Sequence, residues 1–427
     1  MGERAVQRRY FGMTAMVATA AMVAGLAGCG SSDEGGDVTL KLVAADYGTG
    51  AADSSQDYWD KLARAFESKN AGIKVDVDVY SWKDVDRKVA EMVEAGSAPD
   101  IAQIGAYADY VKQDKLYRTE ELVSVPTQAN FLPLLSDAGR VDRVQYGVPF
   151  AASTRLLFFN KDLFSAAGLE APTTWAGIRT AAEKLKASGV EYPFALPLGS
   201  EESQAETMIW LLSGGGGYQN RSSGVYEIDS AENIDTFNWL RDNLVTPKLT
   251  GPVAPAQLDR AQAFAAFTRG EVGMLNGHPT LMQTAEKAGI DVGTVPMPGI
   301  EGKAPASMGV ADWMMGFKQH GHRKEIGRFL DFAYSDTNVL EFSERYDILP
   351  VTVTASQKME ADDAHKDLQP FLEALPHSEL YPFGETSWAK VSASVKKNIG
   401  SAVQPEGDPA AILGRIASEA AAAEAKE

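Results

Sequence analysis

The sequence predicts an α/β protein whose chain is divided between two lobes. Strand-like and helix-like segments alternate between residues 38 and 105, the order expected of βαβ units and a parallel sheet. Extended segments then recur near 146–168, 303–317 and 347–355, and no Gly/Ser-rich linker precedes the first of them. The 427 residues are long enough for two domains of about 150–200 residues each.

The first part of the chain carries the clearest signals for single elements. VTLKLVAADY and IKVDVDVY alternate residue types with a period of two, which predicts strands. Apolar residues at i, i+3, i+4 and i+7 from Trp59 predict a helix between them. The predicted order is a strand at 38–47, a helix at 54–68, a strand at 73–80, a helix at 84–96 and a strand at 99–105.

The rest of the chain is mostly helical between the extended crossings. Asp408 and Pro409 form a helix-start signal for the last helix, as N-cap and first helical residue. Because the chain crosses between the two lobes more than once, each lobe is built from two segments. We expect an N-terminal lobe of 38–151 plus 308–350 and a C-terminal lobe of 152–307 plus 351–427. Helices are expected near 174–188, 202–213, 230–244, 258–269, 278–288, 324–335, 366–375, 385–399 and 408–424.

The N-terminus reads as an export signal followed by a tether. Three arginines precede the uncharged segment 11–27, which ends in small residues directly before Cys29, the only cysteine of the chain. Leu26-Ala27-Gly28-Cys29 resembles the lipobox of bacterial lipoproteins, which implies cleavage after residue 28 and acylation of Cys29. Residues 1–28 are therefore predicted as a signal peptide and 29–37 as a flexible tether. A buried core cysteine is the less favoured alternative.

The charge of the chain limits the classes of partner. The formal net charge is -18, and removal of one glutamate and three arginines with residues 1–28 changes it to -18 + 1 - 3 = -20. Such a surface repels nucleic acid and anionic lipid, and it is compatible with neutral or cationic ligands. No segment after residue 28 has the roughly 20 apolar residues that a membrane span needs.

Four segments resemble the family 1 extracellular solute-binding proteins, the substrate-capturing lipoproteins of bacterial ABC importers of the maltose- and oligosaccharide-binding type. These are APDIAQIGAYADYVKQDKLY (98–117), YGVPFAASTRLLFFNKDLFSAAGLEAPTTWAGIRTAAEKL (146–185), RGEVGMLNGHPTLMQ (269–283) and GVADWMMGFKQHGHRKEIGRFLDFAYSD (309–336). The resemblance spans about 38–427, in the same order as in the family.

The resemblance implies a type II periplasmic-binding-protein fold, with two lobes that each contain a mostly parallel sheet flanked by helices and are joined by a multi-strand hinge. It implies a monomer that captures a carbohydrate in the cleft between the lobes. A di- or oligosaccharide is the expected ligand. It further implies delivery to the permease subunits of an ABC transporter from the outer side of a membrane. No chemistry on the solute, no cofactor and no metal are implied.

A sugar site needs aromatic rings for its C–H faces and converging polar groups for its hydroxyls. In open α/β sheets, ligands bind beyond the carboxyl ends of the strands. Tyr47, Trp82 and Tyr107 each follow a predicted strand at this edge. We therefore expect them at the site, although a packing role is an equal alternative for Trp82.

The other candidates depend on the resemblance. It places the helix 202–213 on the wall of the cleft, with Glu206 and Trp210 as candidates and core packing as the rival for Trp210. His278 stands beside a proline where relatives often have an aromatic residue, which suggests a hydrogen bond rather than stacking. The remaining candidates are Ser153, Asp312, Trp313 and Trp388, with Asp312 and Trp313 as the best pair. Arg155 is either a ligand contact or a hinge ion-pair residue.

Other functions fit the sequence less well. A secreted glycoside-active enzyme is disfavoured because the chain has neither G-x-S-x-G nor H-E-x-x-H. A metal site at His320 and His322 is disfavoured because no carboxylate cluster lies beside them in the sequence. The same fold could instead bind a polyol, an amino acid or a polyamine, and the negative net charge would suit a cation.

Overall fold

The computed structural model describes residues 37–48, 53–220 and 223–425. The predicted signal peptide, most of the predicted tether and the lipidation site Cys29 lie outside these residues. The strands are β1 (Val38–Asp46), β2 (Ile73–Ser81), β3 (Ile101–Ile104), β4 (Arg140–Val141), β5 (Val144–Gln145), β6 (Val148–Thr154), β7 (Leu156–Asn160), β8 (Tyr192–Phe194), β9 (Val272–Gly277), β10 (Val292–Val295) and β11 (Gly309–Gly316).

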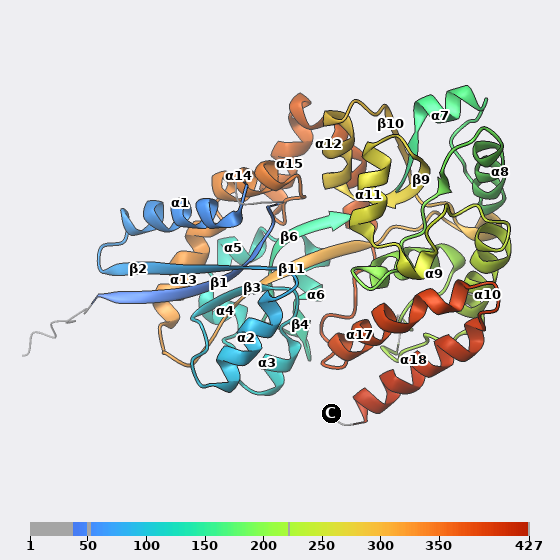
Figure 1. Ribbon diagram of the computed structural model, residues 1–427. Helices are drawn as coiled ribbons and strands as arrows, with labels where there is room; N and C mark the ends of the chain where they lie inside the picture. The colour runs from blue at the N-terminus through green and yellow to red at the C-terminus, as the bar shows by residue number, and fades with distance from the viewer. Residues whose placement is uncertain (1–36, 49–52, 221–222, 426–427) are drawn as a thin grey trace, which may run out of the picture. The chain divides into compact units, whose positions relative to one another are not determined.

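Helices occupy most of the remaining chain (Figure 1). They are α1 (Ser55–Glu67), α2 (Val85–Glu94), α3 (Ala108–Lys112), α4 (Thr119–Leu122), α5 (Val125–Ala129), α6 (Pro133–Ala138), α7 (Lys161–Ala166), α8 (Trp175–Ala187), α9 (Ser203–Gly214), α10 (Ala231–Leu240), α11 (Arg260–Thr268), α12 (Pro279–Lys287), α13 (Arg323–Ala333), α14 (Asp336–Tyr346), α15 (Val353–Ala361), α16 (Gln369–Ala374), α17 (Trp388–Asn398) and α18 (Pro409–Glu424).

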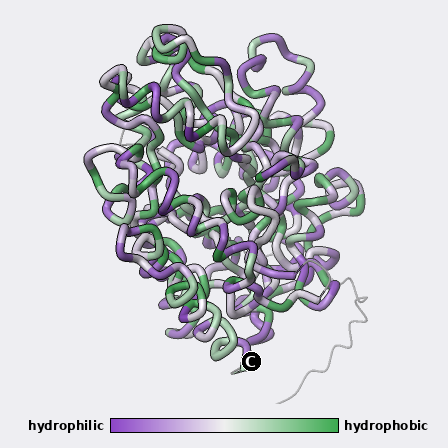
Figure 2. Tube along the Cα trace, turned by 90° about the vertical axis from the view of Figure 1, so that its right-hand side faces the viewer, coloured by the Kyte–Doolittle hydropathy of each residue, from purple (hydrophilic) through white to green (hydrophobic). Residues whose placement is uncertain are grey.

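The strand and helix order predicted for the first part of the chain is confirmed by β1, α1, β2, α2 and β3. The start signal of the last helix is also confirmed, because the Asp408 side chain accepts a hydrogen bond from the Ala411 amide and Pro409 is the first residue of α18. Hydrophilic and hydrophobic residues alternate along the outer helices, as amphipathic packing requires (Figure 2).

The first sheet has the strand order β2-β1-β3-β11-β6. β1 pairs in parallel with β2 and β3, so their carboxyl ends meet at one edge. β11 returns from far along the sequence and pairs antiparallel with both β3 and β6. The register of β11 with β6 shifts between Asp312 and Trp313, a β-bulge that changes the direction of the side chains locally.

The second sheet has the strand order β10-β7-β9-β8. β7 is antiparallel to both β10 and β9, and β8 is parallel to β9. The expectation of mostly parallel sheets is confirmed, because a single strand runs against the others in each sheet. This strand is β11 in the first sheet and β7 in the second sheet, which β7 enters directly after β6 of the first.

The chain passes between the two sheets at the predicted crossings, with one difference. The first passage is the single residue Arg155 between β6 and β7, and the second leads from β10 to β11. The third passage lies after residue 350, where we expected the N-terminal lobe to end. The reason is that the Val353 amide still donates a hydrogen bond to the Asn130 carbonyl of the first part of the chain, at 2.7 Å. The lobe boundaries themselves stay a prediction.

Trp313 lies in the core of the first sheet. Its side chain is fully buried, with ring centroids 5.3 Å from Tyr107 and 5.2 Å from Phe383. A Cβ atom at Gly147 would stand only 2.9 Å from both the Trp313 and Tyr107 rings. The absence of a side chain at Gly147 thus makes room for both rings.

We predict that Trp313→Ala lowers the free energy of unfolding by about 3–5 kcal/mol, because it leaves a large cavity in a closely packed region. Urea denaturation followed by circular dichroism measures this change. The matched control is Trp82→Ala at a side chain that is 37% exposed, which should change the free energy of unfolding by less than about 1 kcal/mol. Equal effects of the two substitutions would contradict the core assignment of Trp313.

Candidate functional site

The carboxyl edge of the first sheet brings together two of the residues predicted from strand ends. Tyr47 follows β1 and Trp82 follows β2, and their ring centroids lie 5.4 Å apart in an edge-to-face arrangement. Trp82 is the only aromatic residue among the exposed large hydrophobic side chains of the described chain. An exposed tryptophan held by a second ring offers a flat apolar surface to a ligand.

Asp312 lies beside these rings. The Tyr47 hydroxyl donates a hydrogen bond to Asp312 Oδ2 at 2.7 Å, and Gln103 Nε2 donates to the same hydroxyl at 3.0 Å. Burial raises the pKa of Asp312 to about 7, although the bond from Tyr47 opposes the change. The negative charges of Asp86 and Glu202 raise this pKa further. The carboxyl group therefore titrates near neutral pH.

Asp86 is a member of the site that the sequence analysis did not identify. It lies in the first turn of α2, and the Gly105 amide donates to Asp86 Oδ1 at 3.2 Å. The residue is exposed, yet the protein around it raises the pKa of its carboxyl group, against the backbone hydrogen bonds and the charge of Lys396. This combination is typical of a side chain at the wall of a recess. Its position four residues after Trp82 is the signal that strand-end reasoning could have used.

A charged network stands at the passage between the sheets. Arg155, which is 5% exposed, places Nη2 2.6 Å from Glu202 Oε1, and Arg260 Nε lies 2.5 Å from Glu202 Oε2. Arg260 also pairs with Glu201 at 2.6 Å. Burial acts to raise the pKa of Glu202, but the charges of Arg155 and Arg260 hold it below its usual value. Arg155 is thus an ion-pair residue at the first passage, one of the two roles that the sequence left open.

Glu206 lies behind this network on α9. Its Oε1 atom accepts hydrogen bonds from Trp210 Nε1 at 2.8 Å and from Asn276 Nδ2 at 2.9 Å. Burial raises the pKa of Glu206 to about 7 despite these two bonds. A cavity of about 10 Å³, room for one water molecule, is lined by Arg155, Pro197, Glu202, Ala205, Glu206, Arg260, Phe264 and Asn276.

Charged groups from the two halves of the chain lie close enough to act on one another electrostatically. The charge of Glu202, from the second half, acts on Asp312 of the first sheet. Lys396 on α17 acts on both Asp86 and Glu202. We define the candidate site as Tyr47, Trp82, Asp86, Asp312, Glu202 and Lys396.

Two other predicted residues, Ser153 and His278, lie on elements next to this region. Ser153 is partly buried on β6, paired in register with Val310 of β11. His278 caps the start of α12, with its ring 4.9 Å from Phe264. Burial lowers the pKa of His278 well below its usual value, and the charges of Arg155 and Arg260 act in the same direction. The imidazole is therefore neutral and can both donate and accept a hydrogen bond.

The remaining predicted aromatic residues are buried. Tyr107 is fully buried, with its hydroxyl donating to the Ala138 carbonyl at 2.6 Å, and Trp313 packs against it. Trp210 is fully buried among Trp175, Phe194 and Trp239. In this structure all three have packing roles, because side chains from distant parts of the sequence cover them, and periodicity in the sequence does not reveal this.

Trp388 has an intermediate position. It begins α17, is 7% exposed, and stacks on Tyr381 with centroids 5.0 Å apart and planes inclined by 26°. The charges of Glu202 and Arg155 both act on Tyr381. Tyr381, which the sequence analysis missed, therefore connects Trp388 to the charged network.

The chemistry of the site is that of a binding surface for polar, uncharged groups. It joins an exposed indole ring with carboxylates that can accept hydroxyl hydrogen bonds. Within the described residues, no group of three or more His, Asp and Glu side chains is arranged to hold a metal ion. Likewise, no helix of the described part is long and apolar enough to cross a membrane.

Comparison with known proteins shows the family and the fold of the chain. The chain is 26% identical over 412 residues to a binding protein of Brucella abortus, covering 94% of this chain and 97% of the relative. It is 26% identical to the sn-glycerol-3-phosphate-binding periplasmic protein UgpB of Brucella melitensis, over 65% of this chain and 64% of that protein.

A similar fold is found in the sugar transporter protein of Arthrobacter chlorophenolicus solved with bound laminaribiose. That structure has a TM-score of 0.76 and 16% identity, and the match covers 90% of this chain and 99% of the other. The type II fold of periplasmic binding proteins is therefore shown for the described residues. Residues 52–339 match the model of the bacterial extracellular solute-binding protein family, and the chain belongs to this family.

Proposed function

We propose that the protein captures a carbohydrate, a di- or oligosaccharide, between its two lobes and delivers it to the permease of an ABC transporter. The observation that carries this proposal is the exposed Trp82 ring, held by Tyr47 and next to the carboxyl group of Asp312. A ring for the C–H face and an acceptor for hydroxyl groups are what a sugar requires. The protein performs no reaction on its solute.

The charges around the site favour a sugar over a phosphorylated polyol such as the one that UgpB is named for. A phosphate group needs unpaired cations. Arg155 and Arg260 are both paired with Glu202, so Lys396 is the cation of the defined site that has no salt bridge within the described residues, and Asp86 and Asp312 would repel an anion beside it. A cationic solute is the second candidate, because Asp86 and Asp312 have no salt bridge to a side chain within the described residues.

Closure of the lobes on the solute would bury it, and it would strengthen each hydrogen bond by excluding water. Only contacts that are made in the closed state favour closure. Lys396 and Glu202 come from the second half of the chain, and Asp86 and Asp312 come from the first. The distances from Lys396 and Glu202 to Asp86 and Asp312 are therefore the ones that change when the lobes move.

We further propose that the mature protein is held outside the cell membrane by acylation of Cys29. The lipobox resemblance and the polar segment 30–37 that follows it support this anchor.

We predict that isothermal titration calorimetry of the protein with a panel of neutral di- and oligosaccharides gives saturable binding for one sugar class. Trp82→Ala should then weaken binding by about 1–2 kcal/mol, because the stacking surface is lost. Val125→Ala, at a side chain 77% exposed on α5, is the control and should bind as the unchanged protein does. A saturable heat of binding on titration with amino acids or polyamines, and none with any sugar, would refute the carbohydrate proposal.

We predict that sugar affinity rises about tenfold between pH 6 and pH 8, since the ionised Asp312 carboxylate accepts hydroxyl hydrogen bonds better than the protonated form. The window follows from the pKa of Asp312, which burial raises to about 7. Asp312→Asn should bind more weakly at pH 8 and show no rise. Calorimetric titrations at pH 6, 7 and 8 measure the slope, and an equal slope in Asp312→Asn would exclude Asp312 as its source.

We predict that Cys29→Ser moves the protein from the membrane fraction to the soluble fraction of expressing bacteria. The reason is that serine lacks the thiol that carries the thioether-linked lipid. Fractionation and the mass of the N-terminal peptide provide the readouts, with Ser31→Ala as the control. An unacylated N-terminus in the unchanged protein would refute the anchor and leave the solute-binding proposal standing.

A further inference from the structure

A row of unpaired cations lies where the predicted tether joins the first sheet. Lys324 and Arg328 are exposed and follow one another at i, i+4 on α13, so they share one face of the helix. Phe332 continues this face, and Lys69 Nζ lies 5.1 Å from the centre of its ring. Within the described residues, none of the three cations has a salt bridge. We call Lys69, Lys324 and Arg328 the basic stripe.

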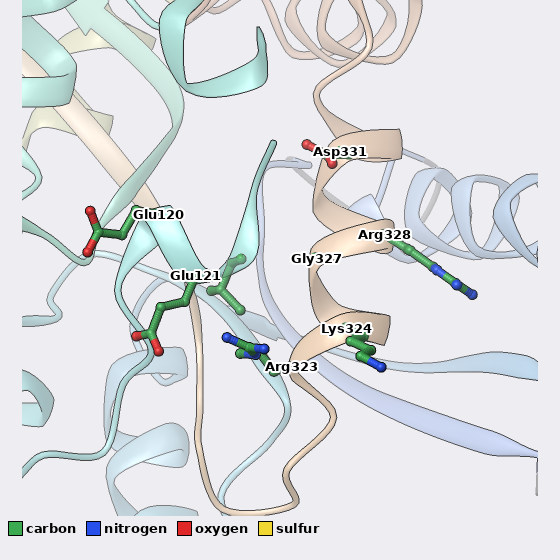
Figure 3. A pocket seen from close by; sticks show the side chains of 8 residues that line it. Glu120, Glu121, Arg323, Lys324, Gly327, Arg328 and Asp331 are labelled. Atoms are coloured by element: carbon green, nitrogen blue, oxygen red, sulfur yellow. The ribbon is translucent and has the colours of Figure 1, made fainter. Parts of the chain in front are cut away.

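Two cations of the basic stripe also line the charged hollow next to it. The hollow, of about 670 Å³, is lined by Lys324 and Arg328 together with Glu120, Glu121, Leu122, Arg323, Gly327 and Asp331. Figure 3 shows that Arg323 lies on the side of Glu121, whereas the side chains of Lys324 and Arg328 point away from it. The acidic groups of the hollow come from α4 and, through Asp331, from α13, while Lys324 and Arg328 extend to the other side of α13.

The stripe and the exit of the tether lie at the same edge of the sheet. The Val38 amide, at the start of β1, donates to the Gly72 carbonyl at 2.8 Å, three residues after Lys69. β11 ends at Gly316, opposite Ile101, so the chain enters α13 from this same edge. Figure 1 shows α13 on the side of the first sheet where β1 begins.

The length of chain before β1 limits how far this edge can be from the membrane. Nine residue steps separate Cys29 from Val38, which span at most about 30 Å when fully extended. The basic stripe is thus held within reach of the headgroup layer whenever Cys29 is acylated.

We propose that the basic stripe contacts anionic lipid headgroups of the membrane that holds the protein and so sets its orientation. This inference rests on the lipid anchor of the proposed function. The net charge of -18 makes most of the surface repel such a membrane. A local group of cations close to the surface is attracted to it, so one edge of the protein turns toward the lipid.

The neighbouring acidic groups do not cancel the stripe. Glu67 pairs with Lys74 at 2.9 Å, and Asp331 accepts hydrogen bonds from the Ser124 amide and the Thr127 hydroxyl. Glu325, on α13 itself, makes no salt bridge with Arg328 within the described residues. Asp37 is exposed next to the start of β1 and is a further acidic side chain at this edge.

The test uses the full acylated chain in vesicles of phosphatidylcholine with or without 30% phosphatidylglycerol. A cysteine at the exposed position Ala71, beside Gly72, carries a fluorophore, and a headgroup-attached nitroxide lipid quenches it. The acylated Cys29 does not compete for the dye. Ala187→Cys on α8 provides the control label far along the chain from the stripe.

We expect the label at Ala71→Cys to be quenched at least twofold more in the anionic vesicles, and 0.5 M NaCl should abolish the difference by screening. Lys324→Glu together with Arg328→Glu should also abolish it. Lys184→Glu together with Lys186→Glu on α8 makes the same charge change and should leave it intact. Circular dichroism checks that each variant is folded.

Equal quenching in both vesicle types would overturn the inference while leaving the anchor in place. A change on charge reversal that is equal in both vesicle types would also overturn it, because the stripe would then bind an acidic protein segment, including the tether itself. The mass of the Cys29 peptide is read from the same sample. An unacylated chain would refute the proposed anchor and this inference with it, whereas sugar binding would be unaffected.

Discussion

The antiparallel pairing of β11 with β3 and β6 is the constraint on which the first sheet and the candidate site depend. Residues 309–316 form this strand, and they lie far behind β3 and β6 in the sequence. Because successive side chains of a strand point to opposite faces, Asp312 accepts a hydrogen bond from the Tyr47 hydroxyl while the neighbouring Trp313 enters the core. Without this pairing, Asp312 would not lie at the site and the Trp313 ring would not be buried in the core of the sheet.

A second constraint comes from the charges that the fold brings into contact. Glu202 pairs with two arginines at the passage between the sheets, and the same carboxylate raises the pKa of Asp312. Burial penalises the ionised forms of Asp312 and Glu206 and raises the pKa of each to about 7. Asp312 lies in the site and Glu206 lies behind the charged network, so the charge of this region is sensitive to a solute that displaces water from it.

Much of the fold and part of the site could be predicted from the sequence. Period-two alternation identified β1 and β2, and the rule for strand ends brought Tyr47 and Trp82 to one edge, where the structure has them 5.4 Å apart. Periodicity could not separate Trp82 from Trp210, because burial of a helix on all sides depends on neighbours distant in sequence. Glu202, Lys396 and Tyr381 escaped prediction for the same reason, since their partners lie on other elements.

The direction of β1 has a consequence for the encounter with solute. The strand starts beside the tether and ends at Tyr47, and its nine residues separate the two edges by about 30 Å. If the chain is anchored through Cys29 as we propose, the edge at the start of β1 lies nearer the membrane than the edge that carries Tyr47. Transfer of a solute to a permease in the same membrane would then require the protein to turn on its tether. The length of the tether would thus limit the rate of delivery as well as set the place of attachment.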